Sequence, residues 1–300
     1  MRASFGLALG GLMGMSMLGI AKASPEITGF DSTTDTVNGG GASIVTGGNT
    51  TNSILQLTNG TATGNGNEGT SSYNTTAQSV GLAFTANFTY TVLAGTSPVA
   101  DGFSFILQNQ SATVGGQNGG SGNSGRGLPV TIANGTNSNG VVAVGVENFS
   151  GSGGAGLYLN ENGTVNPSPT NPGYFTQAST NGGTTKTGNV DFSTFNNPIN
   201  VTITYDGANS LSFSATDGAS DVFSHTYMLT DTVANELAAN TSTALANGTA
   251  FVGFGGGSGG LQETQQISDF TFSTSAVPEP ASLGLLTLGC IGLLARRRRA

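Results

Sequence analysis

One run of the chain alternates apolar and polar residues strictly, and this alternation constrains the fold more than any other feature. Its apolar positions are Leu82, Phe84, Ala86, Phe88, Tyr90 and Val92, and the positions between them include Thr85, Asn87, Thr89 and Thr91. Successive side chains of a β-strand point to opposite faces of a sheet, so a period of two predicts a long strand with one buried face.

Shorter runs of the same kind are spread along the chain. They cover residues 103–107, 142–146, 201–205, 211–215, 251–254 and 267–272. The runs at 201–205 and 211–215 flank Asp206-Gly207, which predicts a hairpin. Helical periodicity is confined to a weak pattern between residues 233 and 245. Strands with one apolar face must pair those faces, so the sequence predicts one all-β domain, a sandwich or a barrel.

Four stretches rich in Gly, Asn and Ser interrupt these runs. They lie at residues 38–52, 115–127, 151–156 and 255–260. Such residues favour turns and do not fill a core, so we predict loops at all four places.

Charge and reactive side chains exclude several functions. Between residues 24 and 276, Arg126 and Lys186 stand against fifteen carboxylates, a formal charge of −13. A body this acidic repels phosphate, which excludes nucleic-acid binding. Cys290 is the only cysteine, so no intrachain disulfide can form. The only histidine, His225, lies in a strand-like run, and we interpret it as a strand-face residue rather than a catalytic base.

The N-terminus has the organisation of a secretory signal peptide. Arg2 precedes an apolar run at residues 5–20, and Ala21-Lys22-Ala23 forms an A-x-A cleavage site. The sequence therefore predicts a signal peptide at residues 1–23, with cleavage between Ala23 and Ser24. An N-terminal membrane anchor is the alternative, but the apolar run is short for a spanning helix.

The C-terminus combines three features in a fixed order. Val277-Pro278-Glu279-Pro280 is followed by a mostly apolar stretch at 281–295 and by four arginines at 296–299. This tail, placed at residues 275–300, resembles the PEP-CTERM sorting signal of exported bacterial proteins. The resemblance implies transient retention in the inner membrane, recognition by an exosortase-type enzyme, and delivery to the cell surface or its polysaccharide matrix. A plain tail anchor is the alternative.

The segments between the two ends follow a recognisable order. They are residues 69–74, 83–92, 100–105 (Ala-Asp-Gly-Phe-Ser-Phe), 142–149 (Val-Ala-Val-Gly-Val-Glu-Asn-Phe), 156–160, 201–207, 252–254 and 267–272. This order resembles a legume-type (L-type) lectin domain over residues 24–274. The resemblance implies an antiparallel β-sandwich of the concanavalin-like jelly-roll type, with a sugar site on loops at one end.

The resemblance also implies a set of site residues. Asp101 would accept hydrogen bonds from sugar hydroxyls, Gly125 and Arg126 lie at the matching positions of a glycine loop that presents backbone N–H groups, and Leu261 and Gln262 would line the other side. Sugars are polyols, so a carboxylate acceptor, bare backbone donors and an apolar wall suit them. The plainer interpretation of Asp101-Gly102 is turn chemistry before a strand.

The metal positions of that family are altered in this chain. The family holds calcium and a transition metal with a Glu and an Asp on one strand, and Gly145 and Glu147 occupy these positions here. Glu147, Asn148 and the carbonyl of Phe149 predict at most a weak calcium site, because calcium takes six to eight oxygen ligands. The same residues argue against a transition-metal site.

Three functions follow as expectations. The first is a non-enzymatic, exported carbohydrate-binding protein that acts on polysaccharide of the extracellular matrix. The second is a structural or adhesive surface protein with a degenerate sugar site. The third is a glycoside hydrolase, which needs two carboxylates, whereas Gly145-Val146-Glu147 supplies one.

Overall fold

The structure is a computed structural model of the 300-residue chain. It describes residues 27–38, 42–60, 68–96, 99, 102–113, 140–148, 155–162, 164–165, 175–177, 190–218, 221–238, 245, 248–258 and 261–275.

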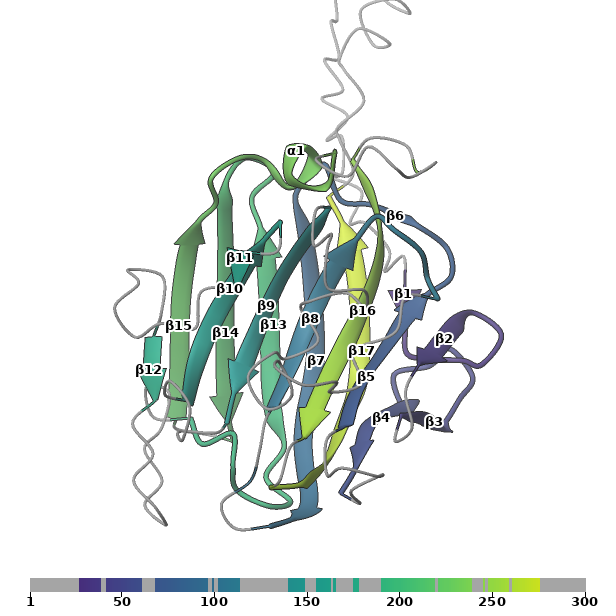
Figure 1. The fold of residues 1–300 in the computed structure, drawn as a ribbon, viewed down its shortest axis with the longest axis vertical. Helices are drawn as coiled ribbons and strands as arrows, with labels where there is room; N and C mark the ends of the chain where they lie inside the picture. Colours follow the sequence, from purple (N-terminus) through teal and green to yellow (C-terminus); the bar gives the residue numbers. More distant parts are fainter. Residues whose placement is uncertain are drawn as a thin grey trace, which may run out of the picture. The chain divides into compact units, whose positions relative to one another are not determined.

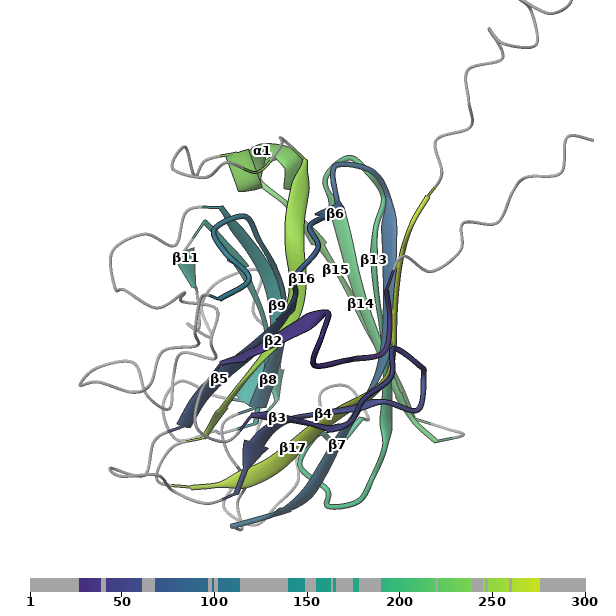
Figure 2. The ribbon, with the colours of Figure 1, turned by 90° about the vertical axis from the view of Figure 1, so that its right-hand side faces the viewer.

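The described residues form two antiparallel sheets packed face to face (Figures 1 and 2). One sheet has the order β15 (Asp221–Met228), β14 (Ser210–Asp217), β13 (Ile199–Tyr205), β7 (Phe84–Gly95), β17 (Glu263–Thr274), β4 (Ile54–Asn59) and β3 (Ser43–Thr46), with β1 (Ile27–Thr28) on β17. The other has the order β11 (Thr164–Val165), β10 (Ala155–Glu161), β9 (Val141–Glu147), β8 (Gly102–Gln108), β16 (Thr249–Ser258), β5 (Glu68–Asn74) and β2 (Asp35–Asn38), with β12 (Phe175–Gln177) on β10 and β6 (Gln78–Ser79) on β16. The predicted antiparallel sandwich is confirmed.

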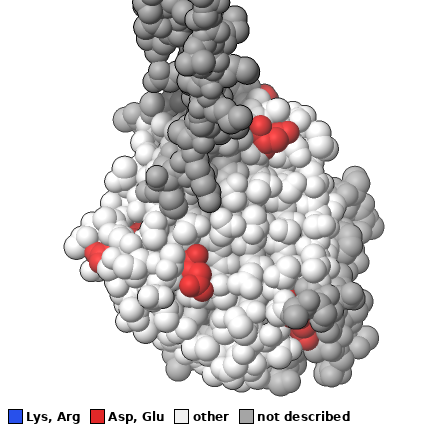
Figure 3. All heavy atoms as spheres, turned by 180° about the vertical axis from the view of Figure 1, so that it is seen from behind, with Lys and Arg blue, Asp and Glu red and all other residues white. Residues whose placement is uncertain are grey.

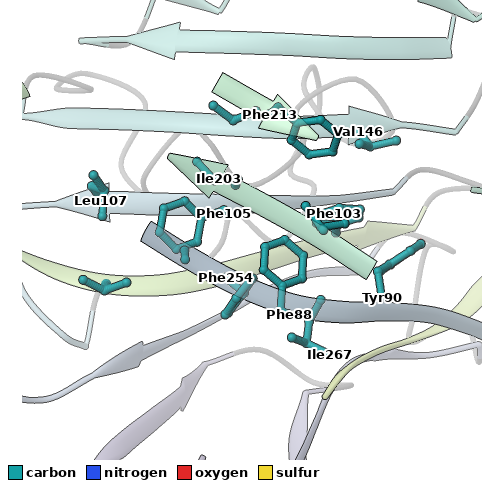
Figure 4. Close-up of a cluster of buried hydrophobic side chains, with 14 of the residues drawn as sticks. Phe88, Tyr90, Phe103, Phe105, Leu107, Val146, Ile203, Phe213, Phe254 and Ile267 are labelled. Carbon is teal, nitrogen blue, oxygen red and sulfur yellow. The ribbon is translucent and has the colours of Figure 1, made fainter. Parts of the chain in front are cut away.

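Aromatic rings from both sheets meet between the layers and form the centre of the core (Figure 4). The ring of Phe254 on β16 lies 4.9 Å from that of Phe88 on β7 and 4.9 Å from that of Phe270 on β17, edge to face in both cases. Phe105 of β8 completes the group at 5.7 Å from Phe254. These rings bury large apolar areas and join the two sheets directly.

The predicted strands and the hairpin are present, but three of the predicted loops are partly strand. β3 lies within residues 38–52, β10 begins at Ala155, and β16 continues through Gly255 to Ser258. The predicted loop at 115–127 lies outside the described residues. Glycine contributes no side-chain pattern, so periodicity could not detect this part of β16. Its backbone nevertheless pairs on both sides, with Gly255 opposite Ser71 of β5 and Ser104 of β8.

A bulge in β17 lets the strand keep its apolar side chains in the core. Ile267 and Phe270 are three residues apart, so a regular strand would point their side chains to opposite faces of the sheet. Both are nevertheless buried. The register with β7 shifts between Ser268 and Thr271, and Asp269 has a φ of 54°. An extra residue in the left-handed region therefore resets the alternation at this point.

The outer face of the sheet that contains β7 is rich in hydroxyl and amide groups. Two register rows cross five strands, namely Thr226–Ser212–Thr204–Thr85–Ser273 and Ser224–Ser214–Thr202–Asn87–Thr271. Thr202 Oγ1 donates to Asn87 Oδ1 at 2.9 Å, and Asn87 Nδ2 donates to Thr271 Oγ1 at 3.4 Å. Figure 3 shows this side of the molecule, where the described surface is neutral apart from isolated acidic groups. A site with charged groups is therefore expected at the ends of the strands and not on this outer face.

A short helix, α1 (Val233–Ala238), covers one end of the sandwich (Figure 1). Tyr205 Oη accepts a hydrogen bond from the backbone N–H of Val233 at 3.1 Å, and Val233 and Leu237 are buried. Glu236 on this helix is 7% exposed and accepts a hydrogen bond from Asn162 Nδ2. Burial, followed by repulsion from the nearby carboxylates of Glu161 and Asp231, raises the pKa of Glu236 above its usual 4.5.

Glu236→Gln should raise the thermal unfolding midpoint at pH 7. An acid with a raised pKa in the folded state favours folding when it is protonated, and this contribution is lost as the pH rises above 4.5 and through the folded pKa. Glutamine keeps an acceptor for Asn162 without the charge, so the variant should also show a flatter pH dependence of the midpoint from pH 4.5 to 7. Calorimetric melts over this range check the prediction.

Asp206→Asn is the control for this prediction. Backbone N–H groups, first that of Ser210 and then that of Ala208, lower the pKa of Asp206 below 3.8. The control should therefore not raise the midpoint at pH 7. Equal midpoints for the Glu236 variant and the unmodified protein across the range would contradict the prediction.

Candidate functional site

The end of the sandwich opposite α1 brings several predicted site segments together. β9 and β16 end there, and β8 and β17 begin there, at the lower edge of Figure 1. One register row crosses five strands at this end, namely Gly69–Gly257–Gly102–Glu147–Gly156. We call this end, with residues 102, 147–148, 257–258 and 261–263, the rim.

The backbone at position 102, directly after Asp101, requires a glycine. Its φ is 124°, and a Cβ at this position would lie 1.9 Å from the carbonyl oxygen of Val146. Only glycine permits this close approach of β8 to β9. Asp101 itself lies outside the described residues, but Gly102, the residue after it, lies opposite Glu147 in the register.

Leu261 and Gln262 lie at the same end, immediately before β17. Both are partly exposed. Gln262 is held through its backbone, because its carbonyl accepts from Thr96 N at 2.8 Å and its N–H donates to Thr96 Oγ1 at 2.9 Å. Gly95 allows this contact, since a Cβ there would lie 2.1 Å from the carbonyl oxygen of Gln262. The side chain of Gln262 is thus carried by a fixed backbone.

The described residues at the end of β9 supply only part of a lectin-type metal donor set. Gly145, at the position of the family's Glu, has no side chain to offer, and Glu147 is buried beside Gly102. Asn148 directs Nδ2, a donor, to buried oxygens of the core, and its Oδ1 is buried too. Among the described residues, no three His, Cys, Asp or Glu side chains lie together as a metal site. The weak calcium site stays a prediction, since Phe149 and Asp101 lie outside the described part of the chain.

A buried polar cluster lies directly beneath the rim. Asn148 Nδ2 donates to Glu263 Oε1 at 3.3 Å, to Tyr90 Oη at 3.3 Å and to the carbonyl of Phe192 at 3.3 Å. Tyr90 Oη donates to Glu263 Oε1 at 3.2 Å, and Gln265 Nε2 donates to the same oxygen at 2.5 Å. Glu263 and Gln265 are fully buried, and Asn148 is 6% exposed. The cluster joins β7, β9 and β17.

Electrostatics keep Tyr90 a donor within this cluster. Burial first, and then the negative charge of Glu263, raises the pKa of Tyr90 well above 10. The phenol therefore stays protonated at all physiological pH values and can give its hydrogen to the carboxylate.

Sequence reasoning missed Glu263 and Gln265. Their positions could have revealed them, because both are an even number of residues from Ile267 and therefore fall on the buried face of β17. Their partner Asn148 is 115 positions from Glu263, and periodicity says nothing about such a pairing.

Several predicted residues lie outside the described part of the chain. They are Gly125 and Arg126 of the glycine loop, Ala23 and Ser24 of the cleavage site, and Val277, Pro278, Glu279 and Pro280 of the sorting signal.

His225 lies on β15, where its ring meets that of Tyr227 edge to face at 4.5 Å. Burial lowers the pKa of His225 below 6.5.

Solved structures with a similar fold include legume lectins. A lectin from Bauhinia forficata in complex with GalNAc matches with 18% identity, over 82% of this chain and 94% of the lectin, at a TM-score of 0.55. Lectin I from Ulex europaeus, in complex with the methyl glycoside of α-L-fucose, matches with 16% identity over 83% and 96% of the two chains, at a TM-score of 0.57. Arcelin-5, a lectin-like defence protein from Phaseolus vulgaris, matches with 16% identity over 83% and 96%, at a TM-score of 0.55. The body of the chain therefore has the legume-lectin fold, as its segment order predicted.

The C-terminal prediction is confirmed by sequence. Residues 276–299 match the PEP-CTERM protein-sorting motif. No curated protein matches the chain. In the part of the chain that the structure describes, no helix is long and apolar enough to span a membrane.

Proposed function

We propose that the chain is an exported protein, sorted to the cell surface, that binds polysaccharide or other glycans through the rim and has no enzymatic activity. The register row carries the proposal, because it places Gly102, which follows Asp101, beside Glu147 and Gly257 on a sandwich with the lectin fold. Leu261 and Gln262 lie at the same end. A carboxylate, glycine backbone and a partly apolar wall together suit a polyol.

The proposed binding site has one carboxylate acceptor and a bare backbone. Asp101 accepts hydrogen bonds from sugar hydroxyls, and Gly125 and Arg126 supply backbone donors from the opposite loop. Leu261 packs against an apolar face of the sugar, and Gln262 contributes a further donor and acceptor. Glycoside hydrolysis would need a second carboxylate on the same strand face as Glu147, where the chain has Gly145.

A glycan array tests this function. The protein to apply is the body, residues 24–275, which contains every residue of the described core cluster. It should retain one class of glycan both in EDTA and in calcium, and release no reducing sugar from it. Failure to retain any glycan in either condition would instead support a surface protein that keeps the sandwich without a sugar site, which the incomplete metal donor set favours as the second candidate.

The sorting signal has its own expected outcome. In a bacterium with an exosortase-type enzyme, the mature chain should begin at Ser24 and lack the arginines at 296–299. We propose that residues 281–295 hold the chain transiently in the inner membrane until Val277-Pro278-Glu279-Pro280 is recognised. The double variant Pro278→Ala, Pro280→Ala should accumulate in the membrane fraction with its tail intact, as mass spectrometry would show. Surface delivery equal to that of the unmodified chain would contradict this assignment.

A further inference from the structure

We propose that Glu263 is a positioning residue that holds the rim in its glycan-binding geometry without a metal ion. The inference rests on the proposed function for its ligand, but its structural part concerns the rim alone. It starts from the mismatch between the rim and a two-metal centre: Gly145 supplies no ligand, and Asn148 turns a donor toward the core.

The amide of Asn148 occupies the place that a cation would take in a ring of oxygens. Its Nδ2 lies 3.3 Å from Tyr90 Oη, 3.3 Å from the carbonyl of Phe192, and 3.3 and 3.4 Å from the two carboxylate oxygens of Glu263. An NH2 group carries two hydrogens and no acceptor, so all four surrounding groups can only accept from it, and they share its two hydrogens. Hydrogen bonds to a buried carboxylate are stronger than those between neutral groups. The amide therefore bridges β7, β9 and β17 as a bound ion would.

Glu263 also sets which way this amide faces. Asn148 Oδ1 is buried and has no hydrogen-bond partner among the described residues. Turning the amide over would place Oδ1 against the carboxylate of Glu263, where two acceptors repel. The charge of Glu263 thus selects one orientation of Asn148, the residue next to Glu147 at the rim.

A second arm of the cluster reaches the end of β16, next to the start of β8. Gln265 Nε2 donates to Glu263 Oε1 at 2.5 Å and to the carbonyl of Gly257 at 3.0 Å. Gly257 lies opposite Gly102 in the register. Glu263 is therefore linked through Asn148 to the end of β9 and through Gln265 to the end of β16, the two strands that flank the start of β8.

The first test needs neither a variant nor a glycan. Hydrogen exchange of the body, followed by NMR, should give the same protection of the backbone amides at 146–148 and 263–266 in EDTA and in calcium. The side-chain NH2 of Asn148 should exchange slowly in both. Loss of this protection in EDTA, or a gain on adding calcium, would overturn the proposal, because the rim would then depend on a metal.

The second test compares Glu263→Gln with Asp269→Asn. Glutamine keeps the shape of Glu263 but replaces one carboxylate oxygen with an NH2 group and removes the charge. Both oxygens accept from Asn148 Nδ2, so either replacement removes an acceptor and the side-chain NH2 of Asn148 should exchange at least about 10-fold faster. Asp269 is an exposed carboxylate on the same strand, and its change to Asn should leave that exchange unaltered. Tyr90→Phe, which removes one hydroxyl and preserves the packing, should give a smaller acceleration and serves if Glu263→Gln fails to fold. Identical Asn148 exchange in these variants and the unmodified protein would overturn the proposal.

The third test adds the glycan that the array identifies. In EDTA, Glu263→Gln should weaken binding about 10-fold and Asp269→Asn should not. Equal affinities would overturn the role of Glu263 in binding. If the unmodified protein binds no glycan, the proposed function fails, whereas the exchange measurements still decide whether Glu263 holds the rim.

Discussion

Phe254→Ala should lower the free energy of unfolding by about 3–5 kcal/mol, the usual cost of deleting a buried ring. Phe254 lies at the middle of the core, in contact with Phe88 and Phe270 from one sheet and Phe105 from its own sheet. Its removal opens a cavity between the two layers, and the surrounding β-strands can collapse only partly into it. Urea or guanidinium unfolding of the body measures the change.

Phe195→Ala is the matched control. Phe195 is 38% exposed, so its truncation should cost less than about 1 kcal/mol. Equal losses for Phe195 and Phe254 would contradict the sandwich core described above, because a ring between two sheets cannot be as dispensable as one at the surface.

Asp101→Ala should weaken glycan binding by about 10- to 100-fold and leave the unfolding midpoint nearly unchanged. A hydrogen bond to a charged acceptor contributes about 1.5–3 kcal/mol, which corresponds to that range of affinity. Asparagine at the same position should retain part of the binding, because it keeps one acceptor oxygen. Calorimetric titration of the two variants and the unmodified body measures the effect.

Asp206→Ala separates this role from turn chemistry. Asp206 also precedes a glycine, and its Oδ1 accepts from the backbone N–H groups of Ala208 at 2.8 Å and Ser210 at 3.0 Å. Its loss should lower stability and leave glycan affinity unchanged. If Asp101→Ala behaves in the same way, with a loss of stability and unchanged binding, Asp101 is a turn residue and not a sugar ligand.

Most of the fold was predictable because apolar and polar residues alternate along its strands, which indicates one buried face. The run from Phe84 to Val92 lies within β7, and the strands on each side of Asp206-Gly207 form the expected hairpin. The end of β16 was not predictable, since Gly255 and Gly257 have no side chain and become strand only because β5 and β8 pair with them. Non-local pairing overrides local composition there.

The candidate site was predictable only through the order of segments. That order placed Leu261 and Gln262 with Asp101, and the structure brings Gln262 and Gly102 to one rim. The support beneath the rim was missed, because the partners Asn148 and Glu263 come from distant strands. The sequence did indicate such a cluster in one way, because β17 has polar residues at positions that alternate onto its buried face.

The most direct test of the central claim is calorimetric titration of the body with its array-selected glycan, first in EDTA and then in excess calcium. We expect the same dissociation constant in both buffers, since side chains beneath the rim rather than ions fix its shape. Binding that appears only with calcium, or no heat in either buffer, would contradict the account.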